Sequence, residues 1–239
     1  MPNDILLTTS GLCKKFKREQ AVHNLSITVH KDTVYGLLGP NGAGKSTTLK
    51  MLVGLLKPTT GSISFAGAKW SRETLRDIGF LIEQPPIYGN LSAKENLKVH
   101  TTLLNLPDSR INEVLELVDL LETDKKRAAN FSTGMKQRLG IAIAILNKPK
   151  LLILDEPTNG LDPIGIQDLR KLIRSFPDMG MTIILSSHIL TEVEHIADEI
   201  GIISHGMLGY EGKLQDTENL EELFTRIVMQ NEERAGETK

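Results

Sequence analysis

Hydrophobic and polar residues alternate along this chain with periods that predict both strands and helices. Residues 24–29 (NLSITV) alternate polar and apolar side chains, which is typical of a half-buried strand. Residues 33–39 (TVYGLLG) and 151–155 (LLILD) are continuous apolar runs, so they predict buried parallel strands at the centre of a sheet. Two later runs, 182–187 (TIILSS) and 200–203 (IGII), continue the pattern. We therefore expect an α/β fold whose polar site lies at the carboxyl ends of these strands.

Helical periodicity dominates residues 84–149, which are predicted to be mostly helical. Ser92 and Glu95 have the spacing of a capping box at the start of a helix. One face of a following helix would carry Ile111, Val114, Leu115 and Val118. The last predicted helix is amphipathic, and its apolar face would carry Leu220, Leu223, Phe224, Ile227 and Val228. The polar tail from Asn231 onward is expected to be loosely ordered.

Composition narrows the classes of function. The chain has 239 residues, and 28 Lys and Arg against 30 Asp and Glu give a net charge of −2, which disfavours a nucleic-acid binder. Cys13 is the only cysteine and cannot form an internal disulfide, and no signal peptide is recognisable, so we expect a cytosolic location. Because no apolar run approaches the roughly 18 residues of a membrane span, any membrane role requires another chain.

A phosphate-binding loop is predicted at GPNGAGKST, from Gly39 to Thr47. Its glycines let backbone N–H groups turn toward phosphates, and the following helix adds its positive end. Lys45 would reach the β- and γ-phosphates, and the Ser46 hydroxyl would bind Mg²⁺. The alternative, a glycine turn with an accidental lysine, fits poorly with the strand before the motif and the helix after it. The predicted nucleotide-binding residues of the loop are Gly39, Asn41, Gly42, Gly44, Lys45, Ser46 and Thr47.

Two neighbouring acids end the apolar run LLILDEP. Asp155 is expected to bind the metal, and Glu156 to accept a proton from the attacking water or to orient it. Two solvated acids at a strand end are the alternative, but Pro157 and the apolar strand enclose them. His188 follows another apolar strand (IILSSH) within reach of the same site. Spacing alone leaves the role of His188 open.

Together these motifs resemble the nucleotide-binding subunit of an ABC transporter, over nearly the whole length from Phe16 to about Gly212. The resemblance implies a P-loop NTPase fold, with a RecA-like core, a β-subdomain and an inserted helical subdomain. The expected division is an ATPase domain followed by a C-terminal amphipathic helix and tail. Its parts would be an ATPase domain at 1–215 (core 1–83 and 150–215, helical lobe 84–149) and a C-terminal segment at 216–239.

The resemblance also assigns roles to further residues. Phe16 would stack on adenine, for which any flat aromatic face can serve. His188 would contact the γ-phosphate, and Asp162, in EPTNGLDP, would belong to the loop that links two ATP sites.

The stretch FSTGM (131–135) occupies the place of the LSGGQ signature of the family. It keeps Ser132 and Gly134, which would face the γ-phosphate of ATP bound by the partner subunit in a head-to-tail dimer. The serine hydroxyl and the helix amides are the donors, while Ser132 would also cap the helix.

Glu83 stands where such subunits usually carry a glutamine, and Gln84 follows it. Either Gln84 takes the metal- and water-sensing role or Glu83 replaces it, and we favour Glu83 because a carboxylate can bind Mg²⁺. This pattern resembles the lantibiotic self-protection and bacitracin-resistance type of ABC ATPase.

The sequence thus predicts an ATP- and Mg²⁺-dependent ATPase subunit that forms a homodimer. It would power peptide export from the cytoplasmic face of the membrane through a permease. Residues 85–105 would meet that permease. An ABC importer and a soluble assembly ATPase are the alternatives. ABC ATPases of DNA repair are disfavoured, because no sustained heptads separate Ser46 from Ser132.

Overall fold

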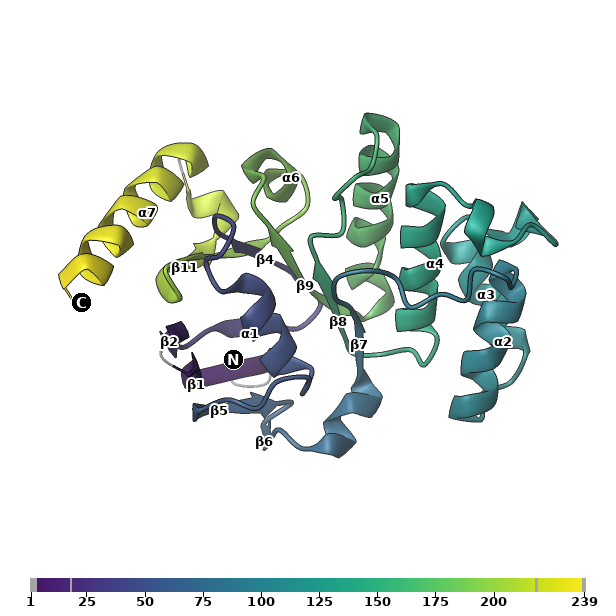
Figure 1. The fold of residues 1–239 in the computed structure, drawn as a ribbon, viewed down its shortest axis with the longest axis horizontal. Helices are drawn as coiled ribbons and strands as arrows, with labels where there is room; N and C mark the ends of the chain where they lie inside the picture. The colour runs from purple at the N-terminus through teal and green to yellow at the C-terminus, as the bar shows by residue number, and fades with distance from the viewer. Residues whose placement is uncertain (1–3, 18, 218, 238–239) are drawn as a thin grey trace.

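The computed structural model describes residues 4–17, 19–217 and 219–237. Six strands form a largely parallel sheet in the order β11-β10-β4-β9-β8-β7, and only the β10–β11 pair is antiparallel (Figure 1). These strands are β4 (Val34–Leu38), β7 (Ile78–Leu81), β8 (Leu151–Asp155), β9 (Thr182–Ser187), β10 (Glu199–Ser204) and β11 (Met207–Lys213). The structure therefore confirms the four apolar runs as strands and the α/β fold.

Both faces of this sheet are covered, which explains the continuous apolar runs. On β4, Tyr35 and Leu37 pack into one core cluster, whereas Val34 and Leu38 pack into the other. The same alternation occurs on β8, where Ile153 packs into the cluster of Tyr35 and Leu154 packs into the cluster of Val34. Because successive side chains of a strand point to opposite faces, an apolar residue is needed at each position.

A second, antiparallel sheet has the order β2-β1-β5-β6, with β3 also paired to β1. Its strands are β1 (Ile5–Phe16), β2 (Glu19–Leu25), β3 (Thr28–His30), β5 (Thr60–Phe65) and β6 (Ala68–Lys69). Helix α1 (Lys45–Leu52) packs between the two sheets, because its Leu49 and Leu52 share a core cluster with Leu7 of β1 and Leu37 of β4. The phosphate loop thus begins on one sheet and ends in a buried helix.

The prediction of one strand over residues 24–29 was wrong. The chain leaves β2 at Leu25 and enters β3 only at Thr28, and both strands pair with β1. Between them, the side chain of Thr9 replaces the regular ladder: its hydroxyl donates to Leu25 O (3.1 Å) and accepts from Ile27 N (2.9 Å). The polar and apolar alternation survives this interruption because Leu25, Ile27 and Val29 all remain buried.

Helices α2, α3 and α4 lie together at one end of the molecule, and α7 lies at the other (Figure 1). The capping box at Ser92 and Glu95 is present, and the predicted apolar face of α3 is buried. The remaining helices are α2 (Ala93–Leu104), α3 (Ser109–Leu117), α4 (Thr133–Ile145), α5 (Pro163–Ser175), α6 (Leu190–Glu194) and α7 (Leu220–Glu237). Short 3-10 turns span Arg72–Asp77, Leu121–Thr123, Ala128–Asn130, Pro177–Met179 and Leu214–Asp216.

Helix α7 buries Leu220, Leu223 and Ile227, as the apolar pattern predicts. The expectation of a loose tail from Asn231 was wrong, because α7 continues to Glu237. Asn231 is 1% exposed, and its amide donates to the backbone oxygens of Ser204 (3.3 Å) and Met207 (3.0 Å). A polar residue thus fastens the helix to the β10–β11 hairpin.

Candidate active site

The phosphate loop connects β4 to α1 in a conformation that depends on glycine. Gly44 caps α1 with φ 102°, and a Cβ atom there would lie 2.6 Å from the backbone oxygen of Ala21. A Cβ atom at Gly39 would lie 2.2 Å from the oxygen of Ile203. Side chains are therefore excluded where the loop packs against the hairpin and β2, and the start of α1 stays open to an anion.

Lys45 lies at the first turn of α1 and is only 5% exposed. Its ammonium group donates to the backbone oxygens of Gly39 (2.7 Å) and Pro40 (3.2 Å) and forms an ion pair with Glu156 Oε1 at 3.1 Å. These contacts hold the charge inside the loop, where a phosphate group would bind.

Glu156 follows β8, and its two carboxylate oxygens have different partners. Oε1 contacts Lys45, and Oε2 lies 2.8 Å from Nδ1 of His188, which follows β9. Strands β8 and β9 are parallel neighbours, so the residues after their carboxyl ends meet. The structure therefore brings together the three predicted catalytic residues Lys45, Glu156 and His188.

Asp155 is the last residue of β8 and is 7% exposed. The hydroxyl of Ser186 on β9 donates to Asp155 Oδ1 (2.6 Å) and accepts from Glu156 N (2.9 Å). Ser186 thus orients both acids, although the sequence analysis did not single it out. In the sequence, the only sign of this role was its position near the end of the apolar run TIILSS, two residues before His188.

A cleft of ≈ 1520 Å³ joins Lys45, Glu156 and His188 to Phe16. Phe16 is 43% exposed, and the Lys14 ammonium group lies 5.0 Å from the centre of its ring. The cleft is lined by the three predicted catalytic residues and by the predicted nucleotide-binding residues Phe16, Asn41, Gly42, Gly44, Ser46 and Thr47. It is also lined by His205 and by Arg234 of α7, which the sequence analysis missed because neither belongs to a motif.

Ser132, Gly134 and Asp162 lie elsewhere, in a separate pocket of ≈ 520 Å³. Ser132 caps α4 by accepting from Met135 N (3.2 Å), and Asp162 caps α5 by accepting from Gly165 N (2.7 Å). Two helix starts therefore open on this pocket, which we name the signature pocket. The nucleotide cleft and the signature pocket share none of their lining residues.

Glu83 is not among the residues that line the nucleotide cleft. Its side chain is 68% exposed and forms an ion pair with Lys50, whose hydrogen bond lowers the pKa of the Glu83 carboxyl. Glu83 has φ 65°, and Gln84 beside it is also exposed. In this conformation Lys50 is the partner of Glu83, and the predicted metal-sensing role stays a prediction.

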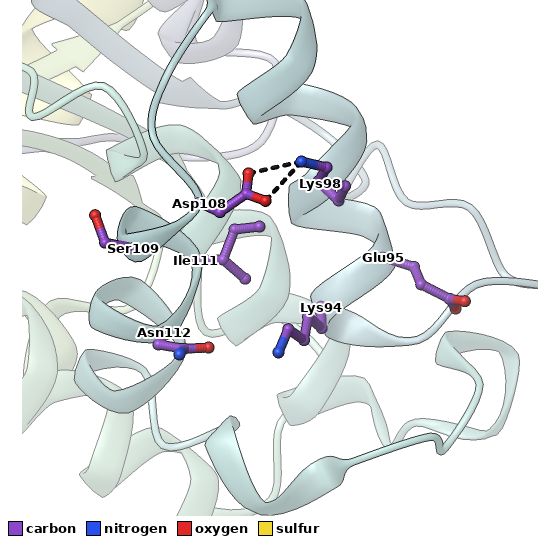
Figure 2. Close-up of a pocket in the computed structure, with 7 residues that line it drawn as sticks. All are labelled: Lys94, Glu95, Lys98, Asp108, Ser109, Ile111 and Asn112. Carbon is purple, nitrogen blue, oxygen red and sulfur yellow. Dashed lines mark hydrogen bonds and ion pairs between the residues drawn. The ribbon is translucent and has the colours of Figure 1, made fainter.

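A further pocket lies between α2 and α3 (Figure 2). The ammonium group of Lys98 lies 2.7 Å from both carboxylate oxygens of Asp108, and Glu95 points away from the pocket. None of the predicted site residues lines it, and it has no glycine loop. The Lys98–Asp108 pair ties the two helices together at the surface, so this pocket is not the nucleotide site.

Residues 22–159 match the profile of a protein family described as ABC transporter. The chain belongs to the ABC transporter family. It is 54% identical over 224 residues to the lantibiotic transport ATP-binding protein SrtF of Streptococcus pyogenes, covering 94% of this chain and 98% of SrtF. It is 48% identical over 208 residues to the bacitracin transport ATP-binding protein BcrA of Bacillus licheniformis, covering 85% of this chain and 68% of BcrA.

Solved structures agree with this membership. An ATP-binding subunit of an ABC transporter superposes with a TM-score of 0.82 at 30% identity, covering 93% of this chain and 99% of that one. A dimeric post-hydrolysis structure of the ATP-binding cassette MJ0796, bound to ADP and Pi, gives 0.77 at 25% identity, covering 87% and 99%. The fold is that of a P-loop NTPase, and this ABC transporter subunit is an ATPase that binds ATP. Among the helices of the described ranges, none combines the length and the apolar character needed to cross a bilayer.

Proposed function

We propose that this ATPase powers the export of a lantibiotic or another peptide that acts on the cell wall, for self-protection or resistance. The similarity to SrtF, which extends over 94% of this chain, supports the substrate class, and the similarity to BcrA supports it further. The contacts of Glu156 with Lys45 and His188 carry the catalytic part of the proposal.

In the proposed reaction, the amides of the phosphate loop bind the phosphates and Lys45 neutralises their charge. Glu156 orients the attacking water and accepts its proton, and His188 donates to the γ-phosphate. When the γ-phosphate binds, Lys45 turns from Glu156 to the phosphate, which leaves the carboxylate available to the water.

The donors present fit a magnesium ion. Mg²⁺ is usually held by one or two carboxylates, substrate phosphates and water, so a protein cage is unnecessary. Within the described ranges, no group of three or more His, Cys, Asp or Glu is arranged to hold a metal. The Ser46 hydroxyl and the Asp155 carboxylate would hold the ion, with Glu83 joining only if it leaves Lys50. Mg²⁺ would supply positive charge beside the β- and γ-phosphates.

We also propose that two copies pair head to tail, so that the signature pocket of one closes over the nucleotide cleft of the other. The separation of the two sites within one chain supports this arrangement. Ser132 and the start of α4 would bind the γ-phosphate held by the Lys45 of the other copy. The dimeric MJ0796 structure is a precedent for pairing within the family.

The helical lobe, proposed to span residues 84–149 of an ATPase domain at 1–215, would provide the permease contact. Residues 85–105 expose Tyr88 (51%), Leu103 (75%) and Leu104 (50%). Large apolar side chains exposed in one segment are typical of a protein contact. Through this contact the subunit would sit at the cytoplasmic face of the membrane.

The substrate is tested by comparing cells with and without the gene on a panel of lantibiotics, bacitracin and unrelated antibiotics. We expect loss of the gene to increase sensitivity to one or more of the peptides that act on the cell wall. The Glu156→Gln variant, produced at the normal level, should give the same sensitivity as deletion. Unchanged sensitivity to the whole peptide class would contradict the proposed substrate, and altered uptake of a nutrient would favour an importer.

A further inference from the structure

Glu192, on α6, is a buried acid outside the predicted site. It is 4% exposed, although its neighbour Glu194 on the same helix is exposed. None of the ion pairs formed in the described part of the chain includes Glu192. Burying an acid without a cation is unfavourable unless hydrogen bonds compensate. The hydrogen-bond partners of Glu192 therefore indicate the role of this buried carboxylate.

Two hydroxyl groups contact the same oxygen of Glu192. Thr158 Oγ1, itself on a residue 5% exposed, donates a short hydrogen bond to Oε2, and Ser187 Oγ lies 3.4 Å from that oxygen. Ser187 also accepts from Ile189 N (2.9 Å), which shapes the turn between β9 and α6. The carboxylate of Glu192 is thus the meeting point of two loops.

Each of these loops carries one of the proposed catalytic residues. Thr158 lies two residues after Glu156, and Ser187 comes directly before His188. The Glu156–His188 contact of 2.8 Å joins the same two loops on the side of the cleft. A shift of either loop would therefore move the base relative to the histidine unless a second contact held them.

We propose that Glu192 is a positioning residue, which fixes the loop after Glu156 to the turn before His188 through Thr158 and Ser187. Glu192 is not among the residues that line the nucleotide cleft. Its effect is on geometry, because a displacement of about 1 Å at a reacting group can cost about a hundredfold in rate. This inference rests on the proposed roles of Glu156 and His188.

The test is the steady-state ATPase activity of the full chain carrying Glu192→Ala. Because the phosphate loop is not touched, we expect KM for MgATP to stay within about twofold, while kcat falls about tenfold to a hundredfold. Glu192→Gln keeps an oxygen that can accept from Thr158, so it should recover most of kcat. Glu194→Ala, which removes the same side chain from the exposed face of α6, is the matched control and should match wild type.

A second variant separates positioning from folding. Thr158→Val removes one hydroxyl at nearly constant volume, and it should lower kcat without changing KM. In the double variant with Glu192→Ala, the two losses should be less than multiplicative, because both changes break the same contact. Thermal unfolding of each variant shows whether the fold is retained.

Three results would overturn the inference: wild-type kcat in Glu192→Ala, a loss confined to KM, or fully multiplicative losses in the double variant. Glu156→Gln is assayed in parallel. If Glu156→Gln is inactive while Glu192→Ala is normal, only the positioning role fails. If Glu156→Gln itself turns over at the wild-type rate, the proposed catalytic mechanism fails.

Discussion

Glu156 Oε2 and His188 Nδ1 lie 2.8 Å apart, although 32 positions separate the two residues in the sequence. The contact exists because β8 and β9 are parallel neighbours that end at the same edge of the sheet. Lys45 joins from a third segment and contacts the other oxygen of Glu156. Each carboxylate oxygen of Glu156, the proposed base, therefore already has a partner in the structure.

Glu156→Gln should bind MgATP normally and lose at least about a hundredfold in turnover, because an amide cannot accept the proton of water. With hydrolysis blocked, the ATP-bound dimer should accumulate. Size-exclusion chromatography with and without MgATP measures this, and ADP serves as the control nucleotide. A variant that turns over rapidly, or that stays monomeric with ATP, contradicts the proposed role.

Gly134→Glu should abolish dimer formation in the Glu156→Gln background while leaving ATP binding intact. The new carboxylate would face the γ-phosphate of the partner, and like charges repel at such short distances. Nucleotide affinity of the isolated subunit should not change, because Gly134 is not among the residues that line its own cleft.

The control for this variant is Asn112→Glu, which adds the same charge at an exposed position of α3. Chromatography should show an ATP-dependent dimer for this control and none for Gly134→Glu. Equal dimer formation by both variants would contradict the head-to-tail arrangement.

Much of the fold was predictable because its signals are local. The continuous apolar run around Leu154 could be interpreted as a strand buried on both faces, and the capping box at Ser92 marked the start of a helix. The interruption at residues 26–27 was not predictable, because it depends on Thr9, a residue of another strand, replacing ladder hydrogen bonds. Periodicity does not contain such a contact.

The candidate site was likewise predictable only in part. Motifs located Lys45, Glu156 and His188, and the structure places them in contact. Glu192 belongs to none of the motifs described above, and nothing in its local sequence distinguishes it from the exposed Glu194. Glu192 is buried and Glu194 is exposed because of how α6 packs against the end of β9.

Glu83→Gln should keep ATP binding and change the coupling of hydrolysis to export. The substitution removes the charge that pairs with Lys50. ATPase activity and peptide protection should therefore respond in different proportions. Both are measured in cells and membranes that contain the permease.

Lys50→Met is the matched variant, because it breaks the same ion pair and keeps the carboxylate. If Glu83 acts toward the metal, Lys50→Met should free the carboxylate and lower the Mg²⁺ concentration needed for half-maximal activity, whereas Glu83→Gln should raise it. A Glu83→Gln variant identical to wild type in turnover and protection would count against any role for this residue.

Asn231→Ala should lower the free energy of unfolding by about 1–3 kcal/mol, because the backbone oxygens of Ser204 and Met207 lose a buried donor. Urea unfolding followed by circular dichroism measures the change. Gln230→Ala, which truncates an amide on the exposed face of α7, should change stability by less than about 0.5 kcal/mol. Equal stability of the two variants would mean that α7 is held by its apolar face alone. The expected difference would instead show that α7 depends on its polar contact with the β10–β11 hairpin. The same hairpin contacts the phosphate loop, because Gly206 N donates to Ala43 O at 2.9 Å.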